Sequence, residues 1–386
     1  MRVAILGAGP AGLYLAYLLK RRRAEIDVRV YEQNPPDATF GFGVVFSDRA
    51  LEFLEEDDAD THAAIRPHLE MWHDITLVHP KGVITVDGVG FAALGRLHLL
   101  QLLQERARSV GVEPSYEDPV QDLGGIGDAD LVVGADGVNS LVRRSFEREF
   151  GSSTSLLTNR FAWFGTTKVF PTLTQTFRRH RLGNFNAHHY RYSPTMSTFI
   201  VEIDEQTFFA AGFDRMDETA SKEVSEEVFA ADLEGHPLVT NRSLWRQFPK
   251  IWNERWWHDK FVLVGDALRT AHFSIGSGTR LAMEDVIALD RALAQHGDDA
   301  RAALPAYEAA RRPIVEKLVG AANTSADWYE HFGDHIELAP MDFAMSYLMR
   351  TGRVDIERLR SVSPRFVAAY EQTKSGKGGA SHASSG

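Results

Sequence analysis

Apolar and polar positions near the start of the chain follow two spacings that predict a strand, a helix and a second strand. Arg2–Leu6 is a short apolar run typical of a buried strand. Leu13–Arg23 has helical spacing and ends in three arginines, where the helix dipole favours cations. Ile26–Glu32 alternates apolar and polar residues, which predicts a second strand. The glycine-rich stretch Gly7–Gly12 should form the turn between the first strand and the helix.

Later segments alternate in the same way between helical and extended patterns. Phe91–Val110 carries leucines that predict a long helix, and Asp130–Ala135 predicts a buried strand. Residues 161–213 are rich in aromatic and β-branched side chains, which predicts antiparallel strands. Phe261–Val264 predicts another short buried strand. Thr279–His296 predicts a helix with one apolar stripe.

These elements predict an α/β fold in which a discontinuous α/β domain holds an inserted antiparallel β-sheet domain. A C-terminal helical segment follows, and the polar, glycine-rich end of the chain is expected to be a disordered tail because it has too little apolar surface to pack. The predicted limits are 1–78, 92–157 and 258–345 for the first domain, 79–91 and 158–257 for the sheet domain, 346–373 for the helical segment and 374–386 for the tail.

Composition and charge exclude several classes of function. The net charge of −11 argues against nucleic acid as a partner. The absence of cysteine excludes disulfides, thiolate metal sites and a redox-active dithiol, and no metal site is predicted. No apolar run reaches the roughly 20 residues of a membrane span, and Pro10 interrupts the apolar start that a secretory signal would need. We therefore expect a soluble, cytoplasmic monomer or homodimer without membrane or nucleic-acid partners.

The first candidate site is a glycine motif between the first strand and the first helix. Gly7 makes the tight turn, Gly9 lets the backbone approach a pyrophosphate, and Gly12 lets the helix pack on the strand. The phosphates would lie at the helix N-terminus. Glu32 closes the second strand, where an acid accepts hydrogen bonds from a ribose. The predicted dinucleotide contacts are Gly7, Gly9, Pro10, Ala11, Gly12, Glu32 and Gln33.

A second motif surrounds Asp136, directly after the buried strand predicted at 130–135. The Asp-Gly turn leads into a helix that Asn139 or Ser140 can cap through a side-chain oxygen. By itself this pattern is an ordinary strand-to-helix turn at least as often as a ligand site. The motif supports a ligand site only because it lies between the first motif and a third one.

The third motif begins at Gly265 and Asp266, which end another buried strand. Asp266 can bind the hydroxyl groups of a ribityl chain. Gly276, Gly278 and Thr279 then open a helix whose free N–H groups and positive dipole end suit the negative edge of a reduced flavin. Alone, this motif is also a tight turn as often as a site.

The three motifs, in this order and at these separations, resemble the FAD-dependent aromatic hydroxylases, the group A flavoprotein monooxygenases typified by p-hydroxybenzoate hydroxylase. The resemblance covers residues 1–345. It implies a Rossmann-like FAD-binding domain of the glutathione-reductase type with an antiparallel substrate domain, and it implies FAD with NADH or NADPH as co-substrate. Asp136 and Asp266 would lie along the pyrophosphate and ribityl chain. Arg96 matches a position that contacts FAD, although a solvated arginine at a helix start is the alternative.

The stretches TFGFGVVFSDRAL, AWFGTTKVF, MSTFIVE and AHFSIGSGTRLAMED are more specifically similar to the salicylyl-CoA 5-hydroxylase and 2-aminobenzoyl-CoA monooxygenase subgroup. They are also similar to a hydroxylase of violacein biosynthesis. This resemblance implies insertion of one oxygen atom from O₂ into an aromatic acyl-CoA through a flavin hydroperoxide. Hydroxylation of an indole or tryptophan-derived compound remains open, as does a binding module that keeps the FAD fold without redox chemistry.

Polar candidates for the ring site come from departures from the family pattern and from one strand. His272 and Phe273 stand where the family has two prolines, and His272 is the preferred polar active-site residue. In the predicted strand 184–192, His188 and Tyr190 share one face. Either could hydrogen-bond a phenol and help to remove its proton. A structural histidine is the alternative for both imidazoles.

Phe42 is predicted to form an aromatic wall for the substrate, because Gly41 and Gly43 on either side permit close backbone approach. Phe164, in the segment FAWFGTTKVF, is assigned to the same substrate site. A basic stretch could bind the phosphates of CoA, although a solvated loop is the alternative. Its residues are Arg178, Arg179 and Arg181.

Overall fold

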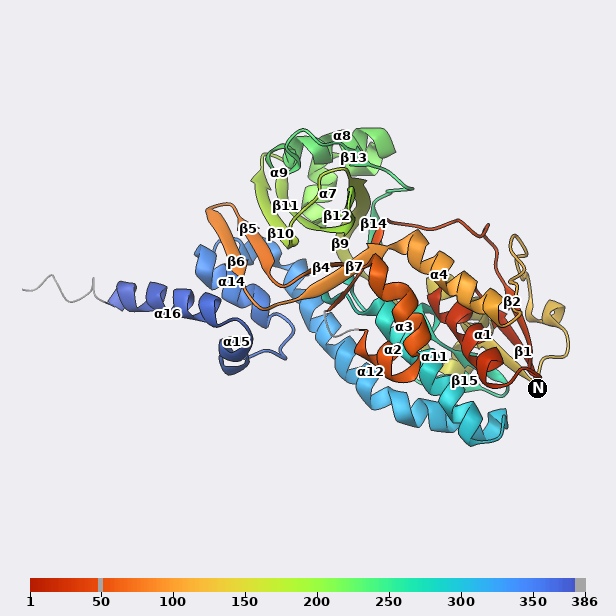
Figure 1. The fold of residues 1–386 in the computed structure, drawn as a ribbon. Helices are drawn as coiled ribbons and strands as arrows, with labels where there is room; N and C mark the ends of the chain where they lie inside the picture. The colour runs from red at the N-terminus through yellow and green to blue at the C-terminus, as the bar shows by residue number, and fades with distance from the viewer. Residues whose placement is uncertain (48–50, 379–386) are drawn as a thin grey trace, which may run out of the picture.

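A mostly parallel β-sheet forms the end of the molecule that holds the N-terminus (Figure 1). The computed structural model describes residues 1–47 and 51–378. In spatial order the strands are β15 (Trp257–His258), β16 (Phe261–Leu263), β8 (Leu131–Gly134), β1 (Arg2–Leu6) and β2 (Asp27–Tyr31). Strands β1 and β8 are buried on both faces, which explains why each is a continuous apolar run.

Four helices connect this sheet to the rest of the molecule. They are α1 (Pro10–Arg22), α4 (Arg96–Ser109), α11 (Gly278–Gln295) and α12 (Ala300–Glu330). Helix α1 packs on β1 and β2 and contacts both α4 and α11. Helix α12 runs along α11 and continues to the long strand β9 (Ser152–Thr166) of the second sheet. It therefore joins the two halves of the fold.

The second sheet is larger and antiparallel, except that β5 and β10 run parallel. Its order is β13 (Leu238–Val239), β9, β12 (Met196–Ile203), β11 (Gly183–Ser193), β10 (Leu173–His180), β5 (Ile75–His79) and β6 (Gly82–Val86), and β14 (Arg246–Asn253) also pairs with β9. A small third sheet lies between the other two. Its strands are β3 (Gly43–Ser47), β7 (Phe91–Gly95) and β4 (Glu70–Trp72).

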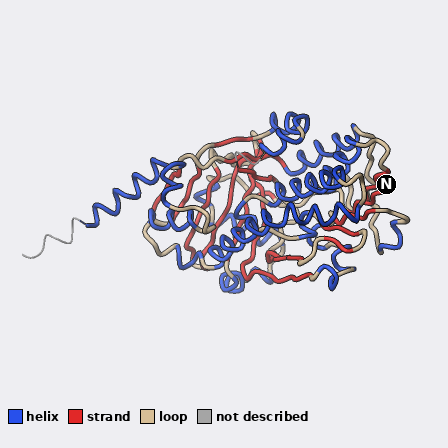
Figure 2. The backbone as a smooth tube through the Cα atoms, turned by 90° about the horizontal axis from the view of Figure 1, so that it is seen from below, coloured by secondary structure: helices blue, strands red, loops and turns tan. Residues whose placement is uncertain are grey.

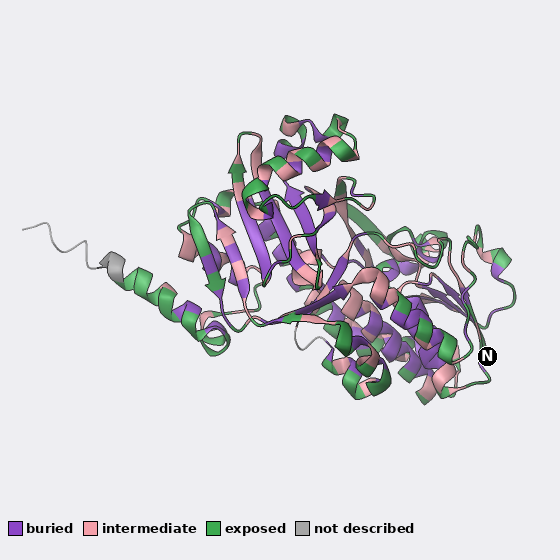
Figure 3. Cartoon of the chain, turned by 45° about the horizontal axis from the view of Figure 1, so that its top comes forward, coloured by how far each residue is buried: buried purple, intermediate pink, exposed green. Residues whose placement is uncertain are grey.

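Apolar cores lie on both faces of the large sheet, and its central strands are buried in Figure 3. One face carries Phe164, Phe185 and Phe199, which pack with Phe229 from the covering helices. The other face packs Phe177 against Trp328 of α12. Because both faces are covered, strands such as β12 show no alternation of buried and exposed residues.

The remaining helices cover these sheets, and the last one extends outward at the end of the molecule opposite the N-terminus (Figures 1 and 2). They are α2 (Glu52–Asp57), α3 (Ala59–Ile65), α5 (Leu141–Ser145), α6 (Glu147–Phe150), α7 (Glu205–Ala211), α8 (Glu218–Val228), α9 (Ala230–Leu233), α10 (Gly265–Leu268), α13 (Phe332–His335), α14 (Pro340–Met349), α15 (Ile356–Val362) and α16 (Pro364–Gly378). Short 3₁₀ helices are η1 (Arg66–His68), η2 (Leu123–Ile126), η3 (Gly137–Asn139), η4 (Phe213–Arg215) and η5 (Phe273–Ile275). No described helix has the length and apolar character to cross a membrane.

The structure corrects three predictions about individual elements. The expected helix 91–110 is strand β7 as far as Gly95, because pairing with β3 and β4 overrides the helical preference of its alanines. The predicted run of strands ends at Ile203, and helices α7–α9 follow. Helix α16 continues through Lys374 to Gly378, with Glu371–Ser375 exposed, and residues 379–386 of the expected tail lie outside the described chain. The domain limits stay a prediction. Strand β5 lies mostly within the range 1–78 predicted for the first domain, but it pairs with strands of the large sheet.

Candidate active site

The three glycine motifs meet at the carboxyl edge of the parallel sheet. Gly134 at the end of β8 lies beside Leu6 of β1 on one side and Leu263 of β16 on the other. The residues that follow these strand ends therefore start from one edge. Ligands of open α/β sheets bind at this kind of edge, outside the carboxyl ends of the strands.

The first motif divides into glycines that the fold requires and one that leaves room for a ligand. Gly7 has φ +100°, and a Cβ on it would overlap the carbonyl of Ala135. A Cβ on Gly12 would overlap the Gly7 carbonyl, so Gly12 permits the close contact of helix and strand. A Cβ on Gly9 would meet nothing within 4 Å. Gly9 therefore borders open space at the start of α1.

The N-terminus of α1 is available to an anion. Pro10 opens the helix, and no side chain caps it. No described residue accepts a hydrogen bond from the N–H groups of Ala11 or Gly12. Glu32 accepts from Ala8 N at 2.8 Å and from Asn34 N at 2.8 Å, which ties the end of β2 to the glycine turn. Of the neighbouring candidates, Gln33 is exposed.

Two carboxylates from the second and third motifs lie at the same edge. Asp136 accepts from Leu141 N at 2.7 Å through Oδ2, but its buried Oδ1 has no partner among the described residues. Burial raises the pKa of Asp136. Asp266 is reached by solvent although protein surrounds it, as expected for a side chain at the bottom of a depression. Burial also raises the pKa of Asp266, against the opposing effect of Arg269 and Arg96.

Helix α11 presents its N-terminus beside Asp266. Gly276 has φ +59° and ends η5, and a Cβ on Gly278 would meet nothing within 4 Å. No described acceptor bonds the N–H groups of Gly278 or Thr279, and the Ser277 side chain does not cap the helix. Gly265 has φ +60° and donates its N–H to Asp285 at 3.1 Å, which fixes the turn that carries Asp266.

Arg96 brings a cation to this edge without a partner. Its side chain makes no hydrogen bond or ion pair with any described residue, and its guanidinium lies 6.0 Å from the centre of the Trp163 ring. Burial lowers the pKa of Arg96, while Asp266 and Tyr190 act in the opposite direction. A half-buried, unpaired guanidinium is costly unless a ligand supplies an acceptor.

These observations together fit the group that the sequence implies. One edge of the sheet carries four groups without a protein partner among the described residues. They are Oδ1 of Asp136, the guanidinium of Arg96 and the uncapped N-termini of α1 and α11. Open space borders Gly9 and Gly278. A dinucleotide with an anionic centre and hydroxyl groups on both sides would satisfy such a set of donors and acceptors. The residues present therefore fit FAD.

The segment 39–43, here called the Phe42 loop, lies close to the large sheet. A Cβ on Gly41 would come within 2.9 Å of the Trp163 ring, and one on Gly43 within 2.6 Å of Tyr192. Both glycines therefore allow the close approach that the sequence predicts, but the neighbours are protein side chains. Phe42 itself lies against Gly165, where a Cβ would come within 2.6 Å of the ring.

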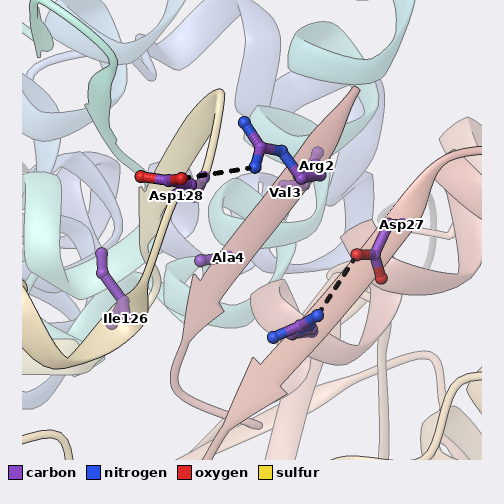
Figure 4. A pocket seen from close by; sticks show the side chains of 8 residues that line it. Arg2, Val3, Ala4, Asp27, Ile126 and Asp128 are labelled. Carbon is purple, nitrogen blue, oxygen red and sulfur yellow. Dashed lines mark ion pairs between the residues drawn. The ribbon is translucent and has the colours of Figure 1, made fainter.

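Two hollows in the surface differ in their relation to this site. The larger, about 610 Å³, is lined by Phe42, Gly95 and Tyr192 among others, so it adjoins the small sheet and the start of α4. The smaller, about 80 Å³, lies at the amino ends of β1 and β2 (Figure 4). Arg2 is 3.9 Å from Asp128 there. Because that hollow is at the opposite end of the strands from the glycine motifs, we assign no chemistry to it.

A buried polar cluster lies where the large sheet faces η5 and α12. Nε2 of His188 is 3.2 Å from Oε2 of Glu202, and Oε1 of Glu202 accepts from Asn159 at 3.0 Å. His272, which precedes η5, is buried, and its ring is tilted by 41° to the ring of Tyr329, with the ring centres 6.0 Å apart. The cluster thus combines residues from β9, β11, β12, α12 and the loop before α11.

Electrostatics keep the two imidazoles neutral. Burial lowers the pKa of His272 to about 4 and also lowers the pKa of His188. Nδ1 of His272 accepts a hydrogen bond from Ser274 N at 3.4 Å and lies 2.9 Å from the Ser274 hydroxyl. Neutral His272 therefore carries its proton on Nε2, which has no hydrogen-bond partner among the described residues.

Comparison with known proteins identifies the family. A model of an FAD-binding domain matches residues 100–322, and a model of an NAD(P)-binding Rossmann-like domain matches residues 5–36. The chain is 43% identical over 362 residues to salicyloyl-CoA 5-hydroxylase of a Streptomyces species, covering 91% of this chain and 70% of that protein. The chain belongs to the FAD-dependent aromatic hydroxylases. FAD is the cofactor of this monooxygenase, and NADH or NADPH is its co-substrate.

Two further similarities place the hydroxylase within the family. It is 35% identical over 351 residues to protodeoxyviolaceinate monooxygenase of Chromobacterium violaceum, covering 90% of this chain and 94% of that protein. The solved structure of 2-methyl-3-hydroxypyridine-5-carboxylic acid oxygenase superposes with a TM-score of 0.71 at 20% identity, covering 94% and 96% of the two chains. The predicted α/β fold with its Rossmann-like FAD-binding region is confirmed.

The hydroxylase places several predicted substrate residues away from the site. Phe164 is buried in the apolar core on the opposite face of the large sheet, whereas its neighbour Trp163 faces Gly41 and Arg96. The three arginines do not form one basic loop. Arg178 pairs with Asp232 at 2.9 Å, Arg181 pairs with Glu227 at 3.0 Å, and Arg179 pairs with Glu337.

Tyr190 and His188 share a face of β11, as predicted, but they differ in their contacts. The Tyr190 hydroxyl donates to the Gly43 carbonyl at 3.1 Å, so it joins β11 to β3. Burial raises the pKa of Tyr190. His189, on the other face, stacks on Phe199 in the apolar core. Tyr190 is therefore bonded to the protein itself, whereas His188 belongs to the polar cluster.

Sequence reasoning missed the partners of the two histidines. Glu202, Asn159 and Tyr329 are far from each other in the chain, and nothing local marks them as members of one site. Arg350, which directly follows α14, was also missed. Its Nη2 donates to Ser274 O at 3.0 Å and its Nε to Ser325 Oγ at 3.1 Å. The only signal in the sequence was the strand segment STFIVEID, whose glutamate stands among apolar residues.

Proposed function

We propose that this hydroxylase acts on the aromatic ring of an acyl-CoA thioester, and that salicylyl-CoA, hydroxylated at position 5, is its substrate. The similarity to salicyloyl-CoA 5-hydroxylase supports this substrate class. The observation that carries the chemical part is neutral His272, with a free Nε2–H in a buried cluster beside the loop that opens α11. We also infer a monomer or homodimer.

When bound, FAD reduced by NAD(P)H would activate O₂, so that one oxygen atom enters the aromatic ring and the other leaves as water. The chain's own residues then have to position the ring, keep water out and control the charge of a phenol. Gly7, Gly9 and Glu32 would hold the ADP half, and Arg96 and Asp266 would hold the middle of the cofactor. The N–H groups at Gly278 and Thr279 would face the negative edge of the reduced ring.

His272 would act on the phenol oxygen of the substrate. Its Nε2–H can donate to that oxygen, which favours the phenolate and makes the ring more electron-rich. Ser274 Oγ lies 2.9 Å from Nδ1 of His272 and 2.8 Å from Ser325 Oγ, so hydroxyl groups lead away from the imidazole. Phe248 and Phe273 contact the His272 ring and form apolar walls beside it.

A direct assay tests the substrate. The FAD-loaded protein is mixed with NADH and salicylyl-CoA, and NADH oxidation and hydroxylated product are followed together. Free salicylate and a tryptophan-derived indole compound serve as comparison substrates. We expect salicylyl-CoA to accelerate NADH oxidation and to give a product with one added oxygen. No acceleration by the thioester, or acceleration only by the indole compound, would overturn the proposal.

A further inference from the structure

A rim of aromatic and basic side chains borders the larger pocket. The pocket is lined by Thr39, Gly41 and Phe42, by 67–70, by the first turns of α4 and by Tyr192–Pro194. Asn241 also lines it, and its Nδ2 donates to Thr39 O at 3.0 Å and Gly41 O at 3.2 Å. These two bonds fix the segment around Asn241 to the Phe42 loop, so the rim is part of the pocket's structure.

Phe40 lies between the pocket residues Thr39 and Gly41, and 42% of its surface is exposed. The guanidinium of Arg242 lies 5.4 Å from the centre of its ring, and that of Arg246 lies 5.9 Å away. Arg242 and Arg246 are both exposed. The arrangement presents one flat apolar ring and two planar cations to solvent at the same place.

Neither arginine has a carboxylate partner within ion-pair distance among the described residues. The nearby acids are engaged elsewhere, because Glu218 accepts from Ser243 N at 2.6 Å and Glu70 pairs with Arg191 at 2.8 Å. This contrasts with Arg178 and Arg179 of β10 and with Arg181 just after it, each of which has a carboxylate partner. On a chain of net charge −11, two unpaired arginines beside an exposed aromatic ring form a distinct local site for an anion.

We propose that Phe40, Arg242 and Arg246 bind the phosphorylated adenosine end of the acyl-CoA, and that the pocket admits its pantetheine arm. This inference rests on the proposed function. A purine can stack on Phe40 or on a guanidinium plane, and arginine forks bind phosphate oxygens in a bidentate way. Two solvated surface arginines are the plain alternative, but that alternative explains neither the exposed ring nor the adjoining pocket.

Strand β11 connects this pocket with the proposed ring site. Tyr192 lines the pocket, and His188, Tyr190 and Tyr192 share a face of β11. At roughly 3.3 Å per residue, His188 and Tyr192 are about 13 Å apart along the strand. An extended chain can therefore connect a nucleotide held at the rim with an aromatic ring held beside His272.

Binding to the FAD-loaded protein tests this site independently of turnover. Coenzyme A alone and NADH alone are titrated by calorimetry into the wild type and into Arg242→Ala/Arg246→Ala and Phe40→Ala. The matched control is Arg301→Ala/Arg353→Ala, because these exposed arginines also lack a carboxylate partner in the described chain. We expect the rim variants to weaken coenzyme A binding about tenfold or more and to leave NADH binding and FAD content unchanged.

Steady-state kinetics separate the two proposals. In the rim variants we expect a higher KM for salicylyl-CoA at unchanged kcat, and no change for the pantetheine thioester, which lacks the nucleotide. Unchanged coenzyme A affinity in both rim variants, or a loss confined to NADH, would overturn the rim proposal. If wild-type protein binds coenzyme A but salicylyl-CoA never stimulates NADH oxidation, the proposed substrate fails while the nucleotide site stands.

Discussion

His188 donates a hydrogen bond from Nε2 to Oε2 of Glu202 across 3.2 Å, and both side chains are buried. Burial opposes ionisation of Glu202, but the hydrogen bonds from His188 and Asn159 help to lower the pKa of Glu202 overall. The same burial lowers the pKa of His188. At neutral pH the pair is therefore a carboxylate with a neutral imidazole, and it gives the ring site a fixed negative charge.

Replacing that charge should lower both the stability of the protein and the share of NADH oxidation that yields hydroxylated product. In Glu202→Gln the amide cannot accept from His188 and Asn159 together, so one buried donor loses its acceptor. We expect a loss of roughly 1–3 kcal/mol in the free energy of unfolding, measured with urea. Less product should form per NADH consumed. Glu223→Gln, at an exposed position, is the control, and equal behaviour of the two variants would contradict the role given to the cluster.

The low pKa of His272 predicts a pH dependence of stability. The folded state holds this imidazole neutral down to about pH 4, whereas the unfolded chain binds the proton near pH 6.5. Between these values the unfolded state binds more protons, so stability falls as the pH is lowered. The full effect is roughly 3 kcal/mol, from about 1.4 kcal/mol per pKa unit.

The measurement compares urea unfolding of the wild type with His272→Asn, whose amide oxygen can still accept from Ser274 N. We expect the difference in stability between the two proteins to shift against the wild type as the pH goes from 7 to 4.5. A difference that does not change over this range would show that His272 is not held neutral by burial.

Two substitutions in the first glycine motif should affect different properties, one the binding of FAD and the other the stability of the fold. Gly9→Val places its side chain in open space, so the fold should survive while FAD binding is lost. Gly12→Ala would overlap the Gly7 carbonyl, so the protein itself should be destabilised. Flavin absorbance after purification and thermal unfolding of the apoprotein distinguish the two results. Normal FAD content in Gly9→Val would contradict the assignment of this edge to the cofactor.

Removing the unpaired cation at Arg96 should separate cofactor affinity from apoprotein stability. Arg96→Gln takes a half-buried charge out of a site where no described residue pairs with it. We expect the apoprotein to become no less stable and the affinity for FAD to fall about tenfold, as for one charge-assisted hydrogen bond. Fluorescence titration of the apoprotein with FAD measures the affinity. An unchanged affinity would favour the solvated-arginine interpretation.

Gly165 should control the position of the Phe42 ring. In Gly165→Ala the new methyl would come within 2.6 Å of that ring, so Phe42 has to move. We expect the KM for the aromatic thioester to rise several-fold at unchanged FAD content. Gly320→Ala in α12 is the matched control, since its Cβ meets nothing and an alanine should stabilise the helix by about 1 kcal/mol. Equal KM values in the two variants would remove Phe42 from the substrate site.

The sequence indicated the cofactor edge well because each part of it is local. The turn at Gly7, the helix packing at Gly12 and the strand ends before Asp136 and Asp266 follow from rules that act within a few residues. Strand β7 was misread because its pairing with β3, far away in the chain, decides its conformation. The apolar segment around Phe164 gave no indication of which face is core, because both faces of the large sheet are covered.

The polar cluster around His272 could not be predicted from the sequence, for a different reason. Its members come from positions 159, 188, 202, 272 and 329, and only the packing of the large sheet on α12 brings them together. The same applies to the rim at Phe40, where the two arginines follow some 200 residues later and reach the ring only because Asn241 is bonded to the Phe42 loop.

Arg350 links the C-terminal helices to the loop that carries His272. Its guanidinium donates to the carbonyl of Ser274, beside His272, and lies 3.9 Å from the centre of the Tyr347 ring. Because Arg350 directly follows α14, this helix is joined to the loop that carries His272. A chain truncated before α14 would lose the hydrogen bonds of Arg350 to Ser274 and Ser325, and with them part of the support of the loop that positions His272.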